Sequence, residues 1–265
     1  MGTDGLPVSC VGPWAQDKHD YLKRYCDIFA TGMKNRWPHR YFLDLFSGPG
    51  LSRSNDTGIE LDGSPLVALE EHNFTDYVFV ESNAEAAYTL RTRVGERISG
   101  RSVSFVQGDV NEKIDDLIAQ VTNRGSLCLA FVDPFTIQVS MATLAKLAGS
   151  RRVDFLIHFP YGTYLKRVLP TQRKEDTNKE IDAFFGCADW RELCRLGSPN
   201  AGELLELYKS QLASMGYQTS DSYPNMKNRK NSPMYCLVLA SRNPRALQFW
   251  NKICAIESSG QRRLL

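Results

Sequence analysis

The clearest structural signal in the chain is the run Arg40-Tyr-Phe-Leu-Asp-Leu-Phe46, followed at once by Ser47-Gly-Pro-Gly50. The first seven residues are mostly apolar and aromatic, a pattern typical of a buried strand. The run ends in a segment with two glycines and a proline, which indicates a turn. We therefore predict a strand that enters a glycine turn, where a ligand can approach the backbone closely.

Similar strand-like runs recur along the chain. They lie at 76–81, 102–106, 127–133, 153–159 and 234–240, and helical patterns lie at 65–72, 84–98, 111–123, 140–148 and 244–256. Strands that alternate with helices and are apolar along most of their length indicate a parallel sheet covered on both faces. We predict a doubly wound α/β fold with a mostly parallel sheet.

Two segments depart from this alternation. Residues 1–39 begin with a stretch over 1–14 that contains Gly and Pro and has no periodicity, which predicts a loose arm, and they continue with a helix over 17–33. Residues 160–200 follow the fifth strand and are polar and basic before helical patterns resume, which predicts a helical or loop insertion. A length of 265 residues allows one large α/β domain with insertions, and we expect a single domain over 1–265.

The composition narrows the class of protein. The chain has 32 Lys and Arg against 30 Asp and Glu and 42% hydrophobic residues, which excludes a disordered protein or a disulfide framework. Seven cysteines without a C-x-x-C pair and four scattered histidines indicate reduced thiols and no metal site. The sequence shows no secretion signal and no apolar stretch of about 18 residues, so we expect a soluble cytoplasmic protein with no membrane contact.

Glycines and carboxylates close the first four predicted strands: Gly48 and Gly50, then Glu81, Asp109 and Asp133. The carboxyl ends of parallel strands meet at one edge of a sheet, where ligands bind. A glycine turn at this edge places a ligand at a helix N-terminus. A carboxylate such as Glu81 can accept hydrogen bonds from both hydroxyls of a ribose, and Asp109 is placed to accept one from an adenine amino group. Together these residues predict a cofactor that contains adenosine.

The glycine turn also bears on which cofactor this is. It does not match G-x-G-x-x-G, because Arg53 occupies the third glycine position, and the chain has no G-x-x-x-x-G-K-[ST] motif. A missing pyrophosphate fingerprint disfavours NAD, FAD and ATP and favours S-adenosylmethionine, whose methionine tail carries no phosphate. An ordinary strand and turn is the alternative interpretation of this segment.

Asp133-Pro134-Phe135 resembles the Asp/Asn-Pro-Pro-Tyr/Phe turn of enzymes that methylate a base nitrogen. In such a turn Asp133 and the Pro134 carbonyl would orient the nitrogen toward the methyl group, and the ring of Phe135 would stack on the flipped base. The alternative is a tight turn with no role in chemistry. His158 has the chemistry of a general base, although a core or surface histidine is the commoner case.

Several of these motifs together resemble the three-Cys-motif partner protein family. The matching segments are Lys18–Tyr25, Tyr41–Gly50, Asp62–Leu66, Val78–Glu81, Gly108–Asn111, Phe131–Phe135, Tyr235–Ser241 and Phe249-Trp250. The resemblance implies a Rossmann-like, class I methyltransferase fold, an S-adenosylmethionine cofactor and a partner protein with a three-cysteine motif. It implies cofactor roles for Asp44, Phe46, Gly48, Gly50, Glu81 and Asp109, and substrate-facing roles for Asp133, Pro134 and Phe135. Thr136 departs from the family, which often has Gly at this position.

Basic residues late in the chain favour a nucleic-acid substrate. Residues 151–174 contain six Lys and Arg with one acid, and residues 223–265 contain eight with one acid. Tyrosines accompany both stretches, as in nucleic-acid-binding surfaces. The predicted nucleic-acid-binding residues are Arg167, Lys227, Arg229 and Lys230. Solvation of surface helices and loops is the alternative explanation.

Three functions are compatible with these patterns. The first is S-adenosylmethionine-dependent methylation of a nitrogen of a DNA or RNA base. No cysteine follows a proline, which disfavours methylation at cytosine C5. The second is a non-catalytic partner subunit of a three-cysteine-motif protein in a nucleic-acid modification or defence system, favoured by the missing second proline after Asp133. A methyltransferase for a small molecule or a protein is a third possibility.

Overall fold

The computed structural model describes residues 1–12, 14–70, 73–95, 101–122, 125–169, 175–195, 199–227 and 232–256. Its main sheet has the strand order β10 (Asn225–Lys227), β11 (Pro233–Ser241), β8 (Val153–Phe159), β7 (Leu127–Val132), β2 (Arg40–Asp44), β5 (Asp76–Glu81) and β6 (Ser102–Gln107). The strands from β8 to β6 are parallel, and β11 runs antiparallel to β8 and also pairs with the short β9 (Gln218–Thr219). The predicted α/β fold is confirmed.

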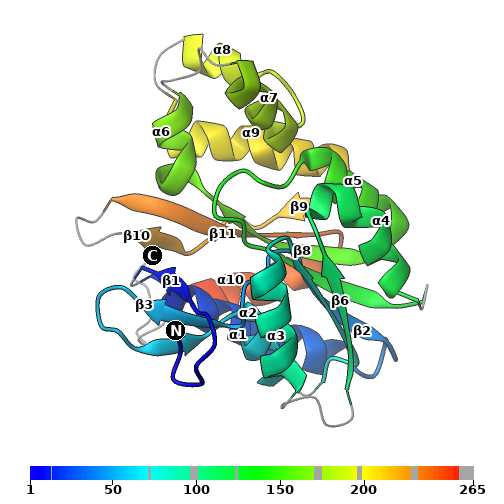
Figure 1. Ribbon diagram of the computed structural model, residues 1–265. Coiled ribbons are helices and arrows are strands. Elements are labelled where there is room, and N and C mark those ends of the chain that lie inside the picture. The colour runs from blue at the N-terminus through cyan, green and yellow to red at the C-terminus, as the bar shows by residue number, and fades with distance from the viewer. Residues whose placement is uncertain are drawn as a thin grey trace.

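Helices cover both faces of this sheet (Figure 1). One face packs against α1 (Ala15–Met33), α2 (Ser64–Glu70), α3 (Ala84–Gly95) and α10 (Pro244–Cys254), and the other against α4 (Val110–Gln120), α5 (Met141–Ser150), α7 (Glu175–Phe185) and α9 (Ala201–Ser214). Successive side chains of a strand point to opposite faces. Accordingly, Phe42 lies in the first core, whereas Tyr41 and Leu43 lie in the second.

The chain reverses its direction across the sheet at β2. From β2 it continues to β5 and β6 on one side, and it later places β7 and β8 on the other side. Loops diverge at such a reversal and leave a crevice at the carboxyl end of the central strand. The glycine turn predicted after residue 46 lies at this point.

Side-chain caps explain where several helices begin. Asp109 caps α4, Ser140 caps α5 and Asn243 caps α10, in each case by accepting a hydrogen bond from a backbone N–H of the first turn. Asn200 and Glu203 form a reciprocal capping box at the start of α9. Each such cap contributes about 1 kcal/mol.

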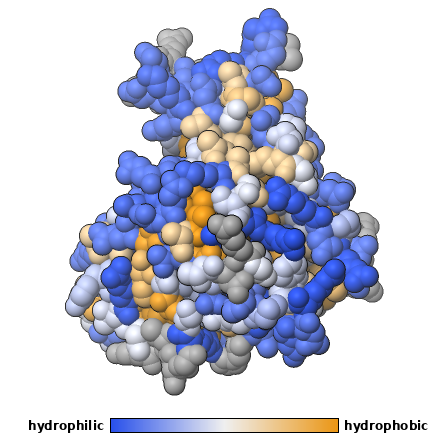
Figure 2. All heavy atoms as spheres, turned by 90° about the vertical axis from the view of Figure 1, so that its right-hand side faces the viewer, coloured by the Kyte–Doolittle hydropathy of each residue, from blue (hydrophilic) through white to orange (hydrophobic). Residues whose placement is uncertain are grey.

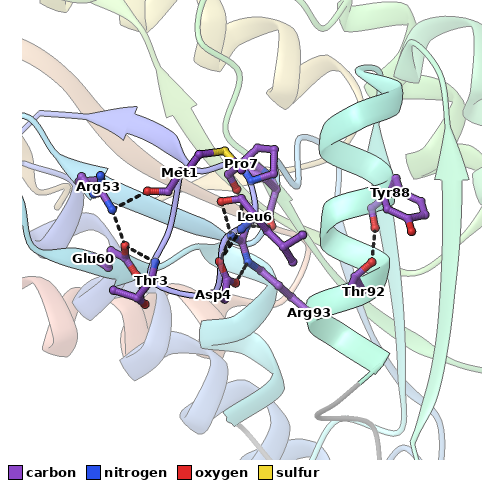
Figure 3. Close-up of polar contacts among 11 residues, drawn as sticks. Met1, Thr3, Asp4, Leu6, Pro7, Arg53, Glu60, Tyr88, Thr92 and Arg93 are labelled. Atoms are coloured by element: carbon purple, nitrogen blue, oxygen red, sulfur yellow. Dashed lines mark hydrogen bonds and ion pairs between the residues drawn. The ribbon is translucent and has the colours of Figure 1, made fainter.

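The N-terminal segment differs from the loose arm expected over residues 1–14. Residues of β1 (Ser9–Val11) pair in parallel with β3 (Leu51–Ser54), which pairs with β4 (Glu60–Asp62). The Arg93 side chain, only 5% exposed, donates to both carboxylate oxygens of Asp4 (Figure 3). It also donates to the carbonyls of Pro7 and Pro49. A buried guanidinium needs acceptors for its five N–H groups, and the N-terminal segment supplies most of them.

The segment after β8 is helical and extends through α9, past the residues 160–200 over which we predicted a helical or loop insertion. It contains η1 (Tyr161–Leu165), α6 (Lys166–Val168), α7, α8 (Trp190–Arg195) and α9, which form a layer above the sheet in Figure 1. The buried rings of Phe184 and Tyr208 stack with their centroids 4.8 Å apart, and the buried Trp190 donates its indole N–H to Asp182 at 2.8 Å. None of the helices in the described ranges is long and apolar enough to cross a membrane.

Candidate active site

A cavity of about 420 Å³ opens at the carboxyl edge of the parallel strands. Its walls come from many parts of the chain, among them β1, the start of α1, the glycine turn, the ends of β5, β7 and β8, and η1 and α6. Four of the predicted cofactor residues line it: Phe46, Gly48, Gly50 and Glu81. The three predicted substrate-facing residues, Asp133, Pro134 and Phe135, line the same cavity. The volume lies in the usual range for a small-ligand site.

The glycine turn depends on backbone conformations that favour glycine. Gly48 and Gly50 have φ angles of +61° and +90°. A Cβ on Gly50 would lie 3.0 Å from Leu90 Cδ1, and a Cβ on Gly63 would lie 2.9 Å from the Gly50 carbonyl oxygen. A Cβ on Gly48 would meet only Ser9 Oγ, at 3.7 Å. Larger residues would therefore strain or fill this wall.

Glu81 connects the end of β5 to the glycine turn. Its Oε2 accepts a hydrogen bond from the Gly48 N–H at 2.7 Å, and its Oε1 accepts one from the Asn83 N–H at 2.8 Å. An ionised carboxylate has about four acceptor positions, so Glu81 retains acceptor capacity on the cavity side. We predicted from the sequence that the ends of these two strands, β2 and β5, lie at the same edge of the sheet. In the structure they are joined by the hydrogen bond between Gly48 and Glu81.

Asp44 lies behind the cavity wall and does not line it. The residue is 0% exposed, its Oδ1 accepts from the Phe46 N–H at 3.2 Å, and its Oδ2 has no hydrogen-bond partner among the described residues. Burial raises the pKa of Asp44 to about 7. Asp44 therefore supports the first residues of the turn from behind.

Asp133 is the centre of a buried polar cluster. Its Oδ2 lies 2.5 Å from Lys18 Nζ, and its Oδ1 lies 3.3 Å from His158 Nδ1, with the Lys18 and Asp133 side chains each 14% exposed. Burial by itself raises the pKa of Asp133, but the Lys18 ammonium and His158 outweigh burial and hold the pKa below its usual value. Asp133 is therefore ionised at neutral pH.

His158 faces the same turn. Its Nδ1 lies 3.0 Å from the Pro134 carbonyl oxygen, and burial lowers the pKa of His158 to about 4, so the ring is neutral at pH 7. Because Nδ1 faces two acceptors, we assign the proton to Nδ1. Nε2 is then a bare acceptor, buried without a partner among the described residues. The Tyr235 ring packs edge-on against His158 at 4.1 Å.

The substrate turn leaves one large aromatic side chain in solvent. Phe135 is 75% exposed although it lines the cavity. The Pro134 carbonyl, predicted to accept from a substrate nitrogen, already accepts from His158. An exposed ring beside a cavity is available to stack on a flat ligand.

Asp109 is not brought into the cavity. It is exposed and caps α4, and its Oδ1 accepts from the Asn111 N–H at 2.7 Å and from Asn111 Nδ2 at 2.9 Å. The segment Gly108-Asp109 does end the third parallel strand, as predicted. The Asp109 side chain, however, caps α4 and does not line the cavity.

The predicted nucleic-acid-binding residues are only partly placed. Arg167 is exposed and lines the cavity. Lys227 ends β10, and its side chain lies outside what the structure describes, as do Arg229 and Lys230 altogether. Within the described ranges, no group of three or more His, Cys, Asp and Glu residues is arranged to hold a metal ion.

Lys18 and the residues of β1 belong to this site but were not predicted from the sequence. Lys18 belongs to a quoted motif segment, but nothing in its local pattern indicated an ion pair with a residue 115 positions away. The β1 residues Ser9, Cys10 and Val11 form one wall of the cavity. A three-residue strand is too short to produce a periodic signal.

Comparison with known proteins identifies the fold. No protein-family model and no curated protein matches the chain. Among solved structures, a DUF519-family protein from Legionella pneumophila matches with a TM-score of 0.53 at 9% identity, covering 94% of this chain and 95% of that one. The O-methyltransferase from Bacillus cereus in complex with SAH matches with a TM-score of 0.53 at 10% identity, covering 90% and 86%. Trm1 from Pyrococcus horikoshii with S-adenosyl-L-methionine matches with a TM-score of 0.52 at 11% identity, covering 94% and 60%.

The chain has the class I methyltransferase fold. The likeness at these identities concerns the fold alone, and the resemblance to the three-Cys-motif partner family stays a prediction.

Proposed function

We propose that the chain is an S-adenosylmethionine-dependent methyltransferase that acts on a nitrogen of a nucleic-acid base. One observation carries this proposal: a single cavity holds both the glycine turn bonded to Glu81 and the Asp133-Pro134-Phe135 turn. A methyl donor and a target nitrogen must meet within about 3.5 Å, and this cavity places the two predicted binding elements side by side.

The residues at the glycine turn fit the adenosine and methionine parts of the cofactor. The Cβ-free face of Gly48 leaves room beside Ser9, and Glu81 keeps lone pairs for the ribose hydroxyls. Phe46 adds an apolar wall. We keep Asp44 as a support of the turn and Asp109 as a residue whose cofactor role requires a shift away from its cap.

When bound, the cofactor supplies a methyl group on a positively charged sulfur. Asp133 accepts a hydrogen bond from the target nitrogen and so orients its lone pair. Lys18 and His158 hold that carboxylate in place, and Phe135 stacks on the base. Because the pKa values of Asp133 and His158 are both low, neither group is a strong base, and the reaction relies on positioning. Methyl transfer makes the nitrogen cationic and its N–H strongly acidic, so the proton then passes to the Asp133 carboxylate that already accepts this hydrogen bond, and from there to solvent.

Two features support nucleic acid as the substrate class. Arg167 places a cation at the cavity, suited to a phosphate. Phe135 offers its exposed ring for stacking, which is sequence-tolerant because every base has a π face. Lys227, Arg229 and Lys230 remain part of the proposed interface.

A second candidate function is a non-catalytic partner subunit of a three-cysteine-motif protein. The specific observation in its favour is that the acceptors of the substrate turn are already engaged: Asp133 by Lys18, and the Pro134 carbonyl by His158. A substrate nitrogen must then share these acceptors.

We also propose that residues 1–265 act as one domain and that the protein works in the cytoplasm. The lack of any disulfide among the described residues supports the second point.

Transfer of a labelled methyl group from S-adenosylmethionine to pools of RNA and DNA tests the proposal. We expect label in one of the two pools with the wild-type chain and a loss of at least about 100-fold with Asp133→Ala, which removes the acceptor that orients the nitrogen. Asp115→Ala is the control, because Asp115 is an exposed carboxylate that pairs with Lys146. Label that persists at the wild-type rate with Asp133→Ala would refute the role of Asp133. Binding of the cofactor with no transfer to either pool would favour the partner-subunit function.

A further inference from the structure

A second hollow lies at the opposite edge of the sheet, where the parallel strands begin. It has a volume of about 450 Å³ and is bounded by the end of α1, the starts of β7 and β8, and the start of α10. Its apolar side chains include Ile28, Met33, Leu127, Val153, Ala246 and Phe249. Figure 2 shows this side of the molecule, with an apolar area bordered by hydrophilic residues. We call this hollow the amino-edge groove.

Cations without carboxylate partners surround the amino-edge groove. Arg36, Arg152 and Arg245 are exposed, line the groove, and form no ion pair within the part of the chain that the structure describes. Arg242 donates to the carbonyls of Ala148 and Met215. The groove therefore has a positive rim around an apolar floor.

The acidic lining of the groove is limited to one buried residue among those described. Asp154 is 8% exposed and accepts a hydrogen bond from Ser241 Oγ at 2.6 Å. The N-terminus of α10, an 11-residue helix, also opens onto the groove and adds partial positive charge. An occupant with carboxylates on its flanks would match this electrostatic pattern.

The chemistry of the floor separates a protein occupant from a nucleic acid. Arg152 lies over the Trp37 ring at 5.0 Å, and Lys252 lies over the Phe249 ring at 6.0 Å, so cations already occupy positions over both rings. Tyr25 and Phe29 also line the groove, but they are 2% and 5% exposed and pack against Trp250 and Phe74. The open part of the floor is therefore mainly aliphatic, and aliphatic side chains suit the apolar face of a helix better than the face of a base.

We propose that the amino-edge groove binds an amphipathic helix of a partner protein, with apolar anchors on one face and Asp or Glu on both flanks. Helices of this kind present anchors at i, i+3, i+4 and i+7. The groove lies on the edge opposite the candidate active site, so the proposal does not depend on methyl transfer. It assigns this face a function that neither the cofactor nor the substrate requires.

A displayed library of 20-residue helical peptides tests the proposal with the full chain. Every peptide carries Leu at an i, i+3, i+4, i+7 repeat, and Glu, Lys or Ser is allowed at all other positions. We expect selection to enrich Glu over Lys on the flanks of the Leu stripe. Failure to enrich any peptide, or enrichment without a preference for Glu, would overturn the proposal.

Variants then locate the bound peptide. Arg36→Glu and Arg245→Glu should each weaken the selected peptide about fivefold, the effect of roughly 1 kcal/mol from one exposed charge pair. Phe249→Ser should weaken it about tenfold or more through lost apolar contact. Lys166→Glu is the control, because Lys166 is exposed on α6 outside the groove, and its affinity should equal that of the wild type.

Charge exchange and a nucleic-acid competitor complete the test. A version of the peptide with Lys in place of Glu should bind Arg36→Glu/Arg245→Glu more tightly than it binds the wild type. A single-stranded RNA of 20 nucleotides should not displace the peptide. Unchanged peptide affinity in the groove variants, or displacement by the RNA, would show that the peptide does not occupy the groove or that the groove binds nucleic acid instead.

Discussion

The carboxyl-edge cavity and the amino-edge groove have nearly equal volumes but are lined by different kinds of side chain. The carboxyl-edge cavity measures about 420 Å³ and the amino-edge groove about 450 Å³. The first buries ionisable side chains, Asp133 and His158, against each other, whereas the second exposes arginines around an apolar floor. Size alone therefore says little about function. Buried, mutually oriented charges are suited to chemistry, and exposed charges around an apolar floor are suited to recognition.

One helix connects the two regions. Near its start, α1 contributes Lys18 to the carboxyl-edge cavity. At its end, its last residue, Met33, lines the amino-edge groove. A 19-residue helix spans about 28 Å at 1.5 Å per residue. The same secondary-structure element thus supplies a buried ion pair at one end and apolar contact surface at the other.

The largest effect on stability is expected from removing the cation at the carboxyl edge. Lys18→Met leaves the Asp133 carboxylate buried without its partner, which costs roughly 3 to 5 kcal/mol of unfolding free energy at pH 7.5. Lys18→Met/Asp133→Asn should recover more than half of this loss, because no uncompensated charge remains. Urea unfolding measures both variants.

Lys23→Met on the same helix is the matched control. Lys23 pairs with Glu70, but these side chains are 62% and 47% exposed, so the change should be within about 0.5 kcal/mol. Equal losses for Lys18→Met and Lys23→Met would remove the distinction between the buried cluster and an ordinary surface pair.

Asp44 should make stability depend on pH. Its folded pKa of about 7 lies above the ordinary value of 3.8, so its contribution is fully present below about pH 4 and is lost as pH rises through 7. Between those limits the unfolding free energy of the wild type should fall relative to that of Asp44→Asn by a few kcal/mol, on the order of 3.

Asp154 at the amino edge provides the comparison for Asp44. Burial raises the pKa of Asp154 to about 6, so the difference between wild type and Asp154→Asn should be smaller and complete about one pH unit earlier. Denaturation curves at half-unit intervals from pH 4.5 to 8 would show this. For Asp44 itself, the prediction would be wrong if the unfolding free energies of wild type and Asp44→Asn changed with pH in parallel, because the Asp44 pKa would then not be raised in the folded state.

The N-terminal wall of the cavity should depend on Arg93. Arg93→Met removes the hydrogen bonds to Asp4, Pro7 and Pro49 and should cost about 2 kcal/mol, the range for bonds to a charged group. Hydrogen exchange over residues 2–11 should accelerate. Arg53→Met is the control, since Arg53 contacts the same segment from a site that is 38% exposed, and slow exchange in both variants would show that β1 is held by its strand pairing alone.

The smallest effect is expected at the amino-edge groove. Arg36→Glu and Arg245→Glu should each change the unfolding free energy by less than about 0.5 kcal/mol, because exposed residues without partners contribute little to folding. Thermal unfolding measures this. A loss above 1 kcal/mol in either variant would mean that the rim supports the fold and is not free for a partner.

The fold was predictable where the sequence pattern is long and consistent. The apolar runs that became β2, β5, β7 and β8 are buried on both faces, so they lack any polar alternation and were easily recognised. The three-residue β1 was not predictable, because it is held by a distant strand and by Arg93 on α3. Its role depends on tertiary contacts that leave no local pattern.

In the candidate site, too, some residues were predictable from the sequence and others were not. Glu81 was predictable because strand ends converge at one edge of a parallel sheet, and its bond to the Gly48 N–H agrees with this. Asp109 shows the limit of that argument, since an acidic residue before a helix is as well suited to capping as to binding. Lys18 and His158 reach Asp133 from other elements, and no spacing rule relates such positions. Their geometry required the structure.

Calorimetric titration of the full chain with S-adenosylmethionine, with NAD and ATP as controls, tests whether the carboxyl-edge cavity binds a methyl donor. We expect binding of S-adenosylmethionine alone, weakened about tenfold or more by Glu81→Gln, which loses a charge-assisted pair of hydrogen bonds. Glu85→Gln, an exposed residue outside the cavity, should bind as the wild type does. Absence of S-adenosylmethionine binding, or equal affinity in Glu81→Gln, would contradict the assignment of the carboxyl-edge cavity as a methyl-donor site.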